Sequence, residues 1–376
     1  MTSKERFHAV CEFRLPDRFP MDYLATPATD ARLYAYYDVA TQDDLLDVLG
    51  IDFYYLSFRD ISQNESSLPF YHGPELEMNG QERVCPFGIR WTRGAYASKF
   101  AVDEAIKGPL EKATRPADIL RYSWPSIDDF DVTPLHQECE RHSDKVLVGG
   151  CWTGILGDSY RMMGFENFLL ALAYNRELAG TLVNRMTDFY LKLNDKVFRE
   201  IGDKLDIWNW GNDFGSQSGL LFSPDMFAEV FLPHIRALNE LAHGYGLKVM
   251  MHSCGAIAPL IPLLIEAGVD ILDPIQVTAA GMDPSSLKQQ FGDRIVFHGA
   301  VDTQHVLPVE DVAGVYGHAQ DILGILGRNG GYIFAPSQIL QADIPVKNIE
   351  AMYRAAREFC PERSTEGTDT RPEALC

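Results

Sequence analysis

His252 and Cys254 can bind a metal ion, or act as a base beside a nucleophile, and only Ser253 separates them. They follow the apolar run Lys248-Val249-Met250 and end at Gly255. Residues two apart in an extended strand project from the same face, so we expect the imidazole and the thiol to point the same way. Both groups are good zinc ligands, and a thiol beside an imidazole is an activated nucleophile. The alternative is a buried cysteine next to a hydrogen-bonded histidine of the core.

The composition favours a globular protein without nucleic-acid or membrane partners. The chain has 376 residues, a formal net charge of -20 at pH 7 and 46% hydrophobic residues, enough for a well-filled core. An acidic surface repels phosphate backbones and anionic lipids. We find no signal peptide and no long apolar stretch, and the seven cysteines contain no CxxC pair, which is typical of free thiols. We therefore expect a cytoplasmic protein.

Eight short β-rich runs are separated, from the third run onward, by helical patterns. The runs are Phe19–Ala25, Asp52–Phe58, Val146–Trp152, Leu205–Gly211, Lys248–Cys254, Val269–Ile275, Ile295–Val301 and Tyr332–Ser337. The helical patterns are Tyr160–Ile201, Pro224–Tyr245, Ile257–Ala267, Pro284–Phe291, Val309–Leu326 and Val346–Glu358. Alternating strands and helices imply parallel strands with right-handed crossovers. An open Rossmann-like sheet is the alternative, but no GxGxxG follows a strand and no GxxxxGK[ST] occurs. The sequence therefore predicts an α/β fold, a (β/α)8 TIM barrel.

One long segment, about residues 59–145, interrupts this alternation between strands 2 and 3. It contains turn and aromatic residues around Cys85-Pro86-Phe87-Gly88 and the acidic run Asp128-Asp129-Phe130-Asp131. We predict an insertion made of a hairpin and a helix that caps the barrel mouth; a surface elaboration without a catalytic role is the alternative. Residues 1–360 are predicted to form a single barrel domain. The polar tail, 361–376, is expected to be disordered.

Chemically useful side chains stand at most of the predicted strand ends, where TIM barrels carry their active sites. The candidates for substrate binding or catalysis are Asp22, Cys151, Trp152, Trp208, Asn212, Asp213, Gln217, His252, Cys254, Gln276, His298, Asp302 and Gln338. Each also has a structural interpretation: the aspartates Asp213 and Asp302 as helix caps, the tryptophans as packing, His298 as a core histidine. The whole set is what favours an enzyme.

Several of these segments resemble the uroporphyrinogen decarboxylase superfamily, which includes the decarboxylase and zinc-dependent methyltransferases that exchange methyl groups with corrinoid proteins. The resemblance runs from about Glu5 to Arg357 and implies a (β/α)8 barrel. It rests on Gly149-Gly150-Cys151-Trp152-Thr153, Asn212-Asp213-Phe214-Gly215-Ser216, Leu221-Phe222-Ser223-Pro224, Phe231-Leu232-Pro233, His252-Ser253-Cys254-Gly255, Gly299-Ala300-Val301-Asp302, Gly330-Gly331-Tyr332-Ile333-Phe334-Ala335-Pro336 and Pro345-Val346-Lys347-Asn348-Ile349.

The resemblance is closer to the methyltransferase branch. The decarboxylase binds its polycarboxylate substrate through an N-terminal Arg-rich loop, and the matching stretch here has no arginine between Arg18 and Arg32. His252-Ser253-Cys254 is similar to the His-x-Cys zinc motif of the methyltransferases. This implies the methyltransferase component of a corrinoid-dependent methyl-transfer or O-demethylation system. It would move a methyl group between a small substrate and a corrinoid carrier protein that holds the cobalamin.

The zinc site implied by the resemblance is incomplete in one respect. The methyltransferases add a second cysteine after the last strand, where this chain has Pro336-Ser337-Gln338. Catalytic zinc usually needs three protein ligands, and His252 and Cys254 are two. The sequence leaves the third open between Asp213, Asp273, His298 and Cys151. The aromatic residues Trp152, Trp208, Trp210 and Tyr160 would suit a flat aromatic substrate or the corrinoid.

Two other functions stay open at this point. One is a metal-independent decarboxylase or lyase of a small or cyclic carboxylic acid, with Asp22 or Asp213 handling the proton; a raised carboxyl pKa would favour it. The other is a non-catalytic barrel that binds a partner, which a blocked pocket would favour.

Overall fold

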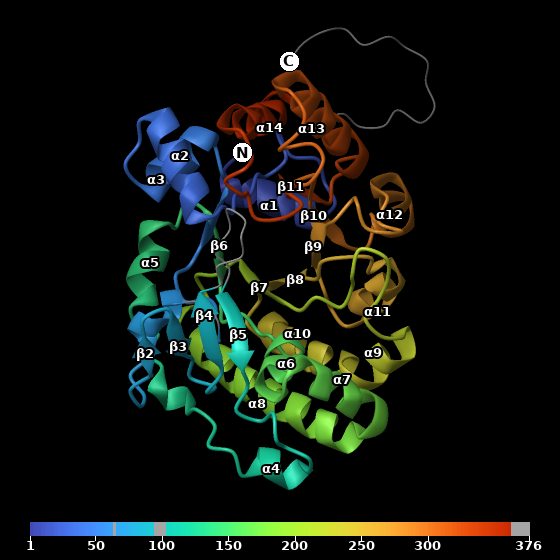
Figure 1. Cartoon of the computed structure of the whole chain (residues 1–376). Coiled ribbons are helices and arrows are strands. Elements are labelled where there is room, and N and C mark those ends of the chain that lie inside the picture. Colours follow the sequence, from blue (N-terminus) through green and yellow to red (C-terminus); the bar gives the residue numbers. More distant parts are fainter. Residues whose placement is uncertain (63–64, 94–102, 362–376) are drawn as a thin grey trace, which may run out of the picture.

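A curled sheet of parallel strands forms the centre of the computed structural model, which describes residues 1–62, 65–93 and 103–361 (Figure 1). In these residues the sheet has seven strands in the order β1-β6-β7-β8-β9-β10-β11. They are β1 (Phe53–Tyr55), β6 (Val146–Gly149), β7 (Ile207–Gly211), β8 (Lys248–His252), β9 (Ile271–Ile275), β10 (Val296–Val301) and β11 (Tyr332–Pro336). Each lies inside a predicted run.

The N-terminal segment lies between the first and last strands of this sheet. Met21 forms a parallel bridge with Phe334 of β11, and Ala25 forms one with Leu340. On the other side, the Asp52 N–H donates to the Met21 carbonyl at 2.9 Å. The first predicted run thus takes the eighth position through isolated bridges instead of a regular strand. The predicted TIM-barrel architecture is confirmed.

Helices cover the outside of the sheet, and some predicted helical stretches are divided. The pattern from residue 160 to 201 forms α6 (Gly157–Met163), α7 (Phe165–Tyr174) and α8 (Arg176–Ile201). The stretch does not form a single helix. Gly164, with φ +87°, separates α6 from α7, and Asn175 caps the start of α8 through its side chain. The remaining helices of the barrel are α1 (Ser3–Cys11), α2 (Pro27–Tyr37), α3 (Gln42–Leu49), α9 (Pro224–Val230), α10 (Leu232–Gly244), η3 (Ala258–Leu260), α11 (Ile261–Glu266), α12 (Pro284–Phe291), α13 (Val312–Leu326) and α14 (Val346–Glu358). No helix in the described ranges is long and apolar enough to cross a membrane.

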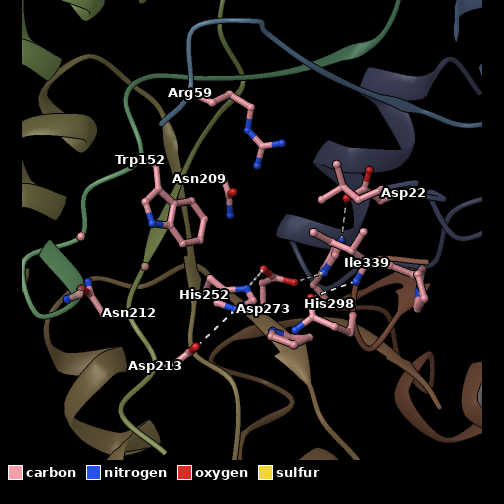
Figure 2. Close-up of a pocket in the computed structure, with 18 of the residues that line it drawn as sticks. Asp22, Arg59, Trp152, Asn209, Asn212, Asp213, His252, Asp273, His298 and Ile339 are labelled. Atoms are coloured by element: carbon pink, nitrogen blue, oxygen red, sulfur yellow. Dashed lines mark hydrogen bonds and ion pairs between the residues drawn. The ribbon is translucent and has the colours of Figure 1, made fainter. Parts of the chain in front are cut away.

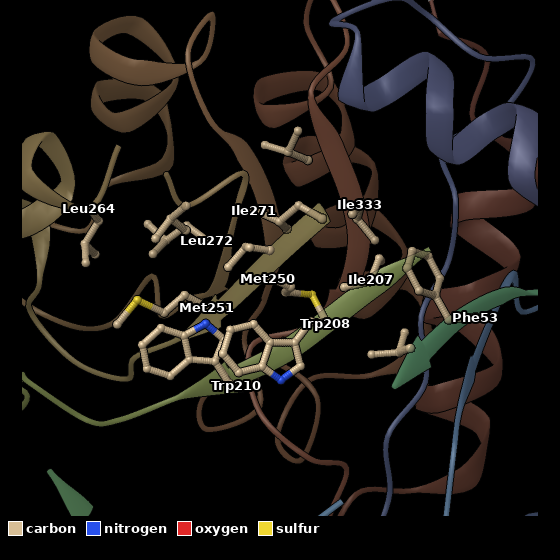
Figure 3. Packing of buried hydrophobic residues seen from close by; sticks show 14 of the residues in the cluster. Phe53, Ile207, Trp208, Trp210, Met250, Met251, Leu264, Ile271, Leu272 and Ile333 are labelled. Atoms are coloured by element: carbon tan, nitrogen blue, oxygen red, sulfur yellow. The ribbon is translucent and has the colours of Figure 1, made fainter. Parts of the chain in front are cut away.

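Residues of strand β7 belong alternately to the hydrophobic core and to the main cavity. Trp208 and Trp210 are fully buried and stack with ring centroids 5.2 Å apart (Figure 3). Their indole N–H groups donate to the Cys151 carbonyl and to Asn239 of α10, at 3.1 and 3.2 Å. Asn209, between them, lines the main cavity. Successive residues of a strand face opposite sides, so the tryptophans pack against the helices while Asn209 faces inward.

A second sheet lies between β1 and β6 along the chain. It is antiparallel, with β2 (Met78–Asn79), β3 (Glu82–Val84), β4 (Arg90–Arg93) and β5 (Asp103–Lys107) in the order β2-β3-β4-β5. The short helices η1 (Glu65–Phe70), α4 (Pro116–Leu120), η2 (Ile127–Asp129) and α5 (Leu135–Arg141) accompany it. The segment therefore contains more strands and helices than the predicted hairpin and helix. Trp91 of β4 lies under the Arg161 guanidinium of α6 at 5.3 Å, beside the barrel mouth; a capping role stays a prediction. The predicted tail lies, from residue 362, outside the described residues.

Candidate active site

A cavity of about 280 Å³ opens at the carboxyl ends of the barrel strands (Figure 2). This is the end where TIM barrels carry their chemistry. Many of its lining residues were predicted from the sequence: Asp22, Trp152, Asn212, Asp213, His252, His298 and Gln338. Among the residues that the structure describes, none blocks this cavity, so the blocked pocket that would favour a non-catalytic barrel is not found there.

Three potential metal ligands meet at one side of this cavity. The donor atoms of Asp213, His252 and Cys254 all lie within 4.8 Å of one another. His252 Nε2 is 3.2 Å from Cys254 Sγ and 3.5 Å from the Asp213 carboxylate. The backbone N–H of Cys254 donates to Asp213 Oδ1 at 2.9 Å and holds that carboxylate in place. A thiol, an imidazole and a carboxylate are a donor set that zinc accepts. Of the four candidates for the third ligand, Asp213 is the one that lies with the pair.

Asp273, at the end of β9, connects this cluster to a second histidine. Its Oδ2 bonds Nδ1 of His252 at 2.7 Å, and its Oδ1 bonds Nδ1 of His298 at 2.7 Å. His298 Nε2 in turn lies 3.0 Å from Asp22 Oδ2. A carboxylate behind a metal-binding imidazole fixes its tautomer and aims the other nitrogen at the metal. Asp273 and His298 therefore orient His252 from behind.

In the absence of metal, the linked side chains of Asp213, His252, Asp273 and His298 carry charges. Burial alone would lower the pKa of His298, but the Asp273 charge and the Asp22 hydrogen bond raise it to about 9. Burial likewise opposes ionisation of Asp273, yet the neighbouring imidazoles hold the pKa of that carboxyl below its usual range. Desolvation also opposes ionisation of the exposed Asp213 carboxyl, but contacts with His252 and Cys254 lower its pKa. Despite its burial, the pKa of His252 is raised well above the ordinary value by Cys254 and Asp273. A metal ion must displace the His252 Nε2 proton, so metal affinity should increase with pH.

We expect His298 to make the stability of the metal-free protein depend on pH. Its pKa rises from 6.5 to about 9 on folding, so its contribution is complete below pH 6.5 and disappears as the pH rises through 9. Relative to His298→Gln, the wild-type free energy of unfolding should fall by about 3 kcal/mol across that interval. Urea unfolding at a series of pH values measures this difference. Parallel pH profiles for the two proteins would contradict it.

Two arginines that line the cavity were missed by the sequence reasoning. Arg59 directly follows the second predicted strand run, so the strand-end rule that selected the other candidates would have found it. Arg161 lies inside α6, where no pattern of residues marks it. Its guanidinium pairs with buried Asp158 at 3.1 Å.

Cys151 and Trp208, predicted as substrate contacts, lie in the core instead. Both are fully buried, and neither lines the cavity. Burial raises the pKa of the Cys151 thiol well above its ordinary value. The thiol is therefore unsuited to metal binding, and we remove both residues from the candidate site.

Three other predicted residues hold loops around the site. Asn212 Oδ1 accepts the N–H groups of Leu156 and Gly157, at 2.8 and 3.0 Å. Gln276 Oε1 accepts the N–H of Gly255 at 2.8 Å, and exposed Gln217 lies 3.5 Å from the Gln304 amide at the rim. These contacts position the strand ends, and of the three only Asn212 also lines the cavity.

Asp302 and Asp213, for which the sequence also allowed a role as helix caps, have different roles in the structure. Asp302 accepts the N–H groups of Gln304 and His305, at 2.7 and 3.0 Å, and so caps the turn after β10. Asp213 caps no helix, because Ser223 is the N-cap of the next one, α9. Asp213 is therefore available to the cavity.

Gln338 belongs to the segment Pro336-Ser337-Gln338, where the resemblance to the zinc methyltransferases implies a second cysteine. Its Nε2 lies 3.2 Å from Cys254 Sγ. The side-chain amide carries both a donor and an acceptor, and rotation about its last bond exchanges them. Gln338 therefore contacts the thiol and can present nitrogen or oxygen to it.

Comparison with known proteins places the chain in a family. The uroporphyrinogen decarboxylase family model matches residues 110–359. The structure is similar to a methyltransferase from Methanosarcina mazei, with a TM-score of 0.66 and 17% identity over 95% of this chain and 99% of that chain. Two D-psicose 3-epimerases are more distant. One, solved in the presence of D-fructose, has a TM-score of 0.38 and 12% identity over 61% of this chain and 84% of that chain. The other, from Clostridium cellulolyticum H10, has a TM-score of 0.36 and 10% identity over 64% of this chain and 83% of that chain. No curated protein matches the sequence.

The segment matched by the family model, residues 110–359, covers well over half of the sequence. The chain belongs to the uroporphyrinogen decarboxylase family.

Proposed function

We propose that this protein is a methyltransferase that moves a methyl group between a small substrate and a corrinoid carrier protein, in a methyl-transfer or O-demethylation system. The observation that carries the proposal is the meeting of Asp213, His252 and Cys254 at an open cavity. Family membership and the methyltransferase fold neighbour support it. The absence of an Arg-rich N-terminal loop argues against a polycarboxylate substrate.

Each residue of the cluster has a distinct task in this proposal. His252 Nε2, Cys254 Sγ and an Asp213 oxygen would hold a zinc ion, which when bound lowers the pKa of a coordinated thiol or polarises an ether oxygen. Asp273 keeps the His252 tautomer that exposes Nε2. The Cys254 N–H keeps Asp213 facing the other two ligands. The Trp152 ring, 5.6 Å from the His252 ring, provides an apolar wall for the substrate.

The metal-independent lyase is less well supported. A carboxyl that donates a proton near neutral pH needs a raised pKa. Desolvation by its surroundings would raise the pKa of the Asp213 carboxyl, but its contacts with His252 and Cys254 lower it. Asp22 accepts hydrogen bonds from the Tyr55 hydroxyl and from His298. The Tyr23 backbone N–H donates to its other oxygen at 2.7 Å, so the carboxylate is already engaged by three donors.

Metal removal tests the proposal. We expect chelator-treated protein to lose methyl transfer from methoxylated compounds to the reduced corrinoid of a carrier protein. One equivalent of zinc should restore the rate, because the three side chains remain in place. Protein that is inactive with every methyl donor at full zinc occupancy would exclude this function. Undiminished activity after chelation would exclude the role of metal.

A further inference from the structure

Arg59 places a cation in the cavity that the proposed methyl-transfer residues do not use. Its guanidinium lines the cavity and lies over the Tyr55 ring, 4.6 Å from the centroid. Among the residues that the structure describes, no carboxylate forms an ion pair with it, whereas the other lining arginine, Arg161, is paired with Asp158. A half-buried cation that faces a cavity, and that no described carboxylate neutralises, is suited to an anionic ligand.

The Tyr55 ring under the Arg59 guanidinium is itself held in place by hydrogen bonds. The Tyr55 hydroxyl donates to Asp22 Oδ2 at 2.6 Å, and Asp22 also bonds His298. The Tyr55 ring on which Arg59 stacks is therefore held by a buried network. A guanidinium stacked through its face keeps its N–H edge free, and that edge matches the two oxygens of a carboxylate.

Trp152 lies next to Arg59 and extends toward the metal-ligand cluster. The backbone N–H of Trp152 donates to the Arg59 carbonyl at 2.8 Å, so the two residues stand side by side at neighbouring strand ends. The Trp152 ring is 5.6 Å from the His252 ring. In Figure 2 Arg59 lies on one side of Trp152, and His252 with Asp213 lies on the other. A flat ring stacked on Trp152 would therefore have one edge toward Arg59 and the opposite edge toward His252.

The size and lining of the cavity fit a single aromatic ring. A dry cavity of about 150 Å³ holds benzene, so about 280 Å³ leaves room for one ring with substituents at two edges. Apolar residues supply part of the remaining wall: Leu24, Pro274, Pro336 and Ile339.

We propose that Arg59 binds the carboxylate of a one-ring aromatic acid whose methoxy group faces His252. This assignment rests on the proposed methyl transfer and names its substrate class. In the reaction the oxygen–methyl bond breaks, the methyl group goes to the reduced corrinoid of the carrier protein, and the electron pair stays on the phenolate oxygen. Arg59 touches only the distal carboxylate, so it determines which substrate binds.

Calorimetric titration of the zinc-loaded protein with 2-, 3- and 4-methoxybenzoate, the matching methoxybenzamides and methoxyacetate tests the assignment. At least one methoxybenzoate should bind ten times more tightly than its amide and than methoxyacetate. Arg59→Gln should weaken binding of that acid about 10- to 100-fold and leave binding of its amide unchanged. Arg294→Gln, which replaces an exposed arginine beside Asp293, should bind like wild type. Circular dichroism confirms that the Arg59 variant is folded.

The outcomes separate this assignment from the proposed function, because binding needs no carrier protein. The assignment is overturned if no methoxybenzoate binds, if acid and amide bind equally, or if Arg59→Gln keeps the preference. Methoxyacetate that binds as tightly as the aromatic acids would also overturn it. Acids that bind through Arg59 but are never demethylated, with zinc and carrier protein present, would show that the proposed function fails while the carboxylate site stands.

Discussion

Replacing Cys254 or His252 with alanine should reduce methyl transfer by more than about 10³-fold and leave the barrel folded. His252 ends β8 and lines the cavity, Cys254 follows two residues later, and His252 Nε2 lies 3.2 Å from Cys254 Sγ. Removing either one leaves two of three potential metal ligands. Initial rates with a corrinoid carrier protein, together with thermal unfolding, measure the two effects separately.

Cys11→Ala is the matched control for this experiment. Cys11 is half-buried near Lys248, at the start of β8 and thus at the opposite end of the strand from the cavity. Its loss should leave the rate unchanged. A Cys254 or His252 variant with full activity would show that the residue is structural.

Asp213→Asn should reduce the rate about 100-fold. Asparagine keeps the shape of the side chain and an oxygen that can accept the Cys254 N–H, but it removes the negative charge that faces His252. A neutral amide is a weaker zinc ligand than a carboxylate. The contacts with His252 and Cys254 outweigh desolvation and lower the pKa of the Asp213 carboxyl, so the charge is present at neutral pH.

The control for the loss of charge is Asp225→Asn, which changes an exposed residue in the first turn of α9. It should have a wild-type rate. If Asp213→Asn is also near normal, Asp213 only organises the loop that follows β7, and the metal site needs another third ligand.

The barrel could be predicted because its strands are short apolar runs separated by helical patterns. Divisions within the helical patterns were harder to predict. Gly164 and Asn175 end helices inside one continuous pattern, because the apolar spacing continues across both breaks. The antiparallel sheet had a signal that was not used: Gly80, at φ +63°, is the first residue of the two-residue turn Gly80-Gln81 between β2 and β3, and glycine at that place is typical of hairpins.

The site was predicted where a strand's inward face could be inferred. His252 and Cys254 share a face by their spacing, and the structure brings them together. Trp208 and Asn209 were harder to assign, because every residue of β7 is buried and the alternation Trp208-Asn209-Trp210 does not by itself say which face lines the cavity. The role of Asp273 depends on a contact between β8 and β9 that only the register of the sheet provides.

The metal content of the purified protein tests the central claim most directly. We predict about one zinc ion per chain in the wild type and none in Cys254→Ala, because the thiolate is one of only three available ligands in the cluster. Wild-type protein that carries no metal, and that neither binds added zinc nor gains activity from it, would contradict the account.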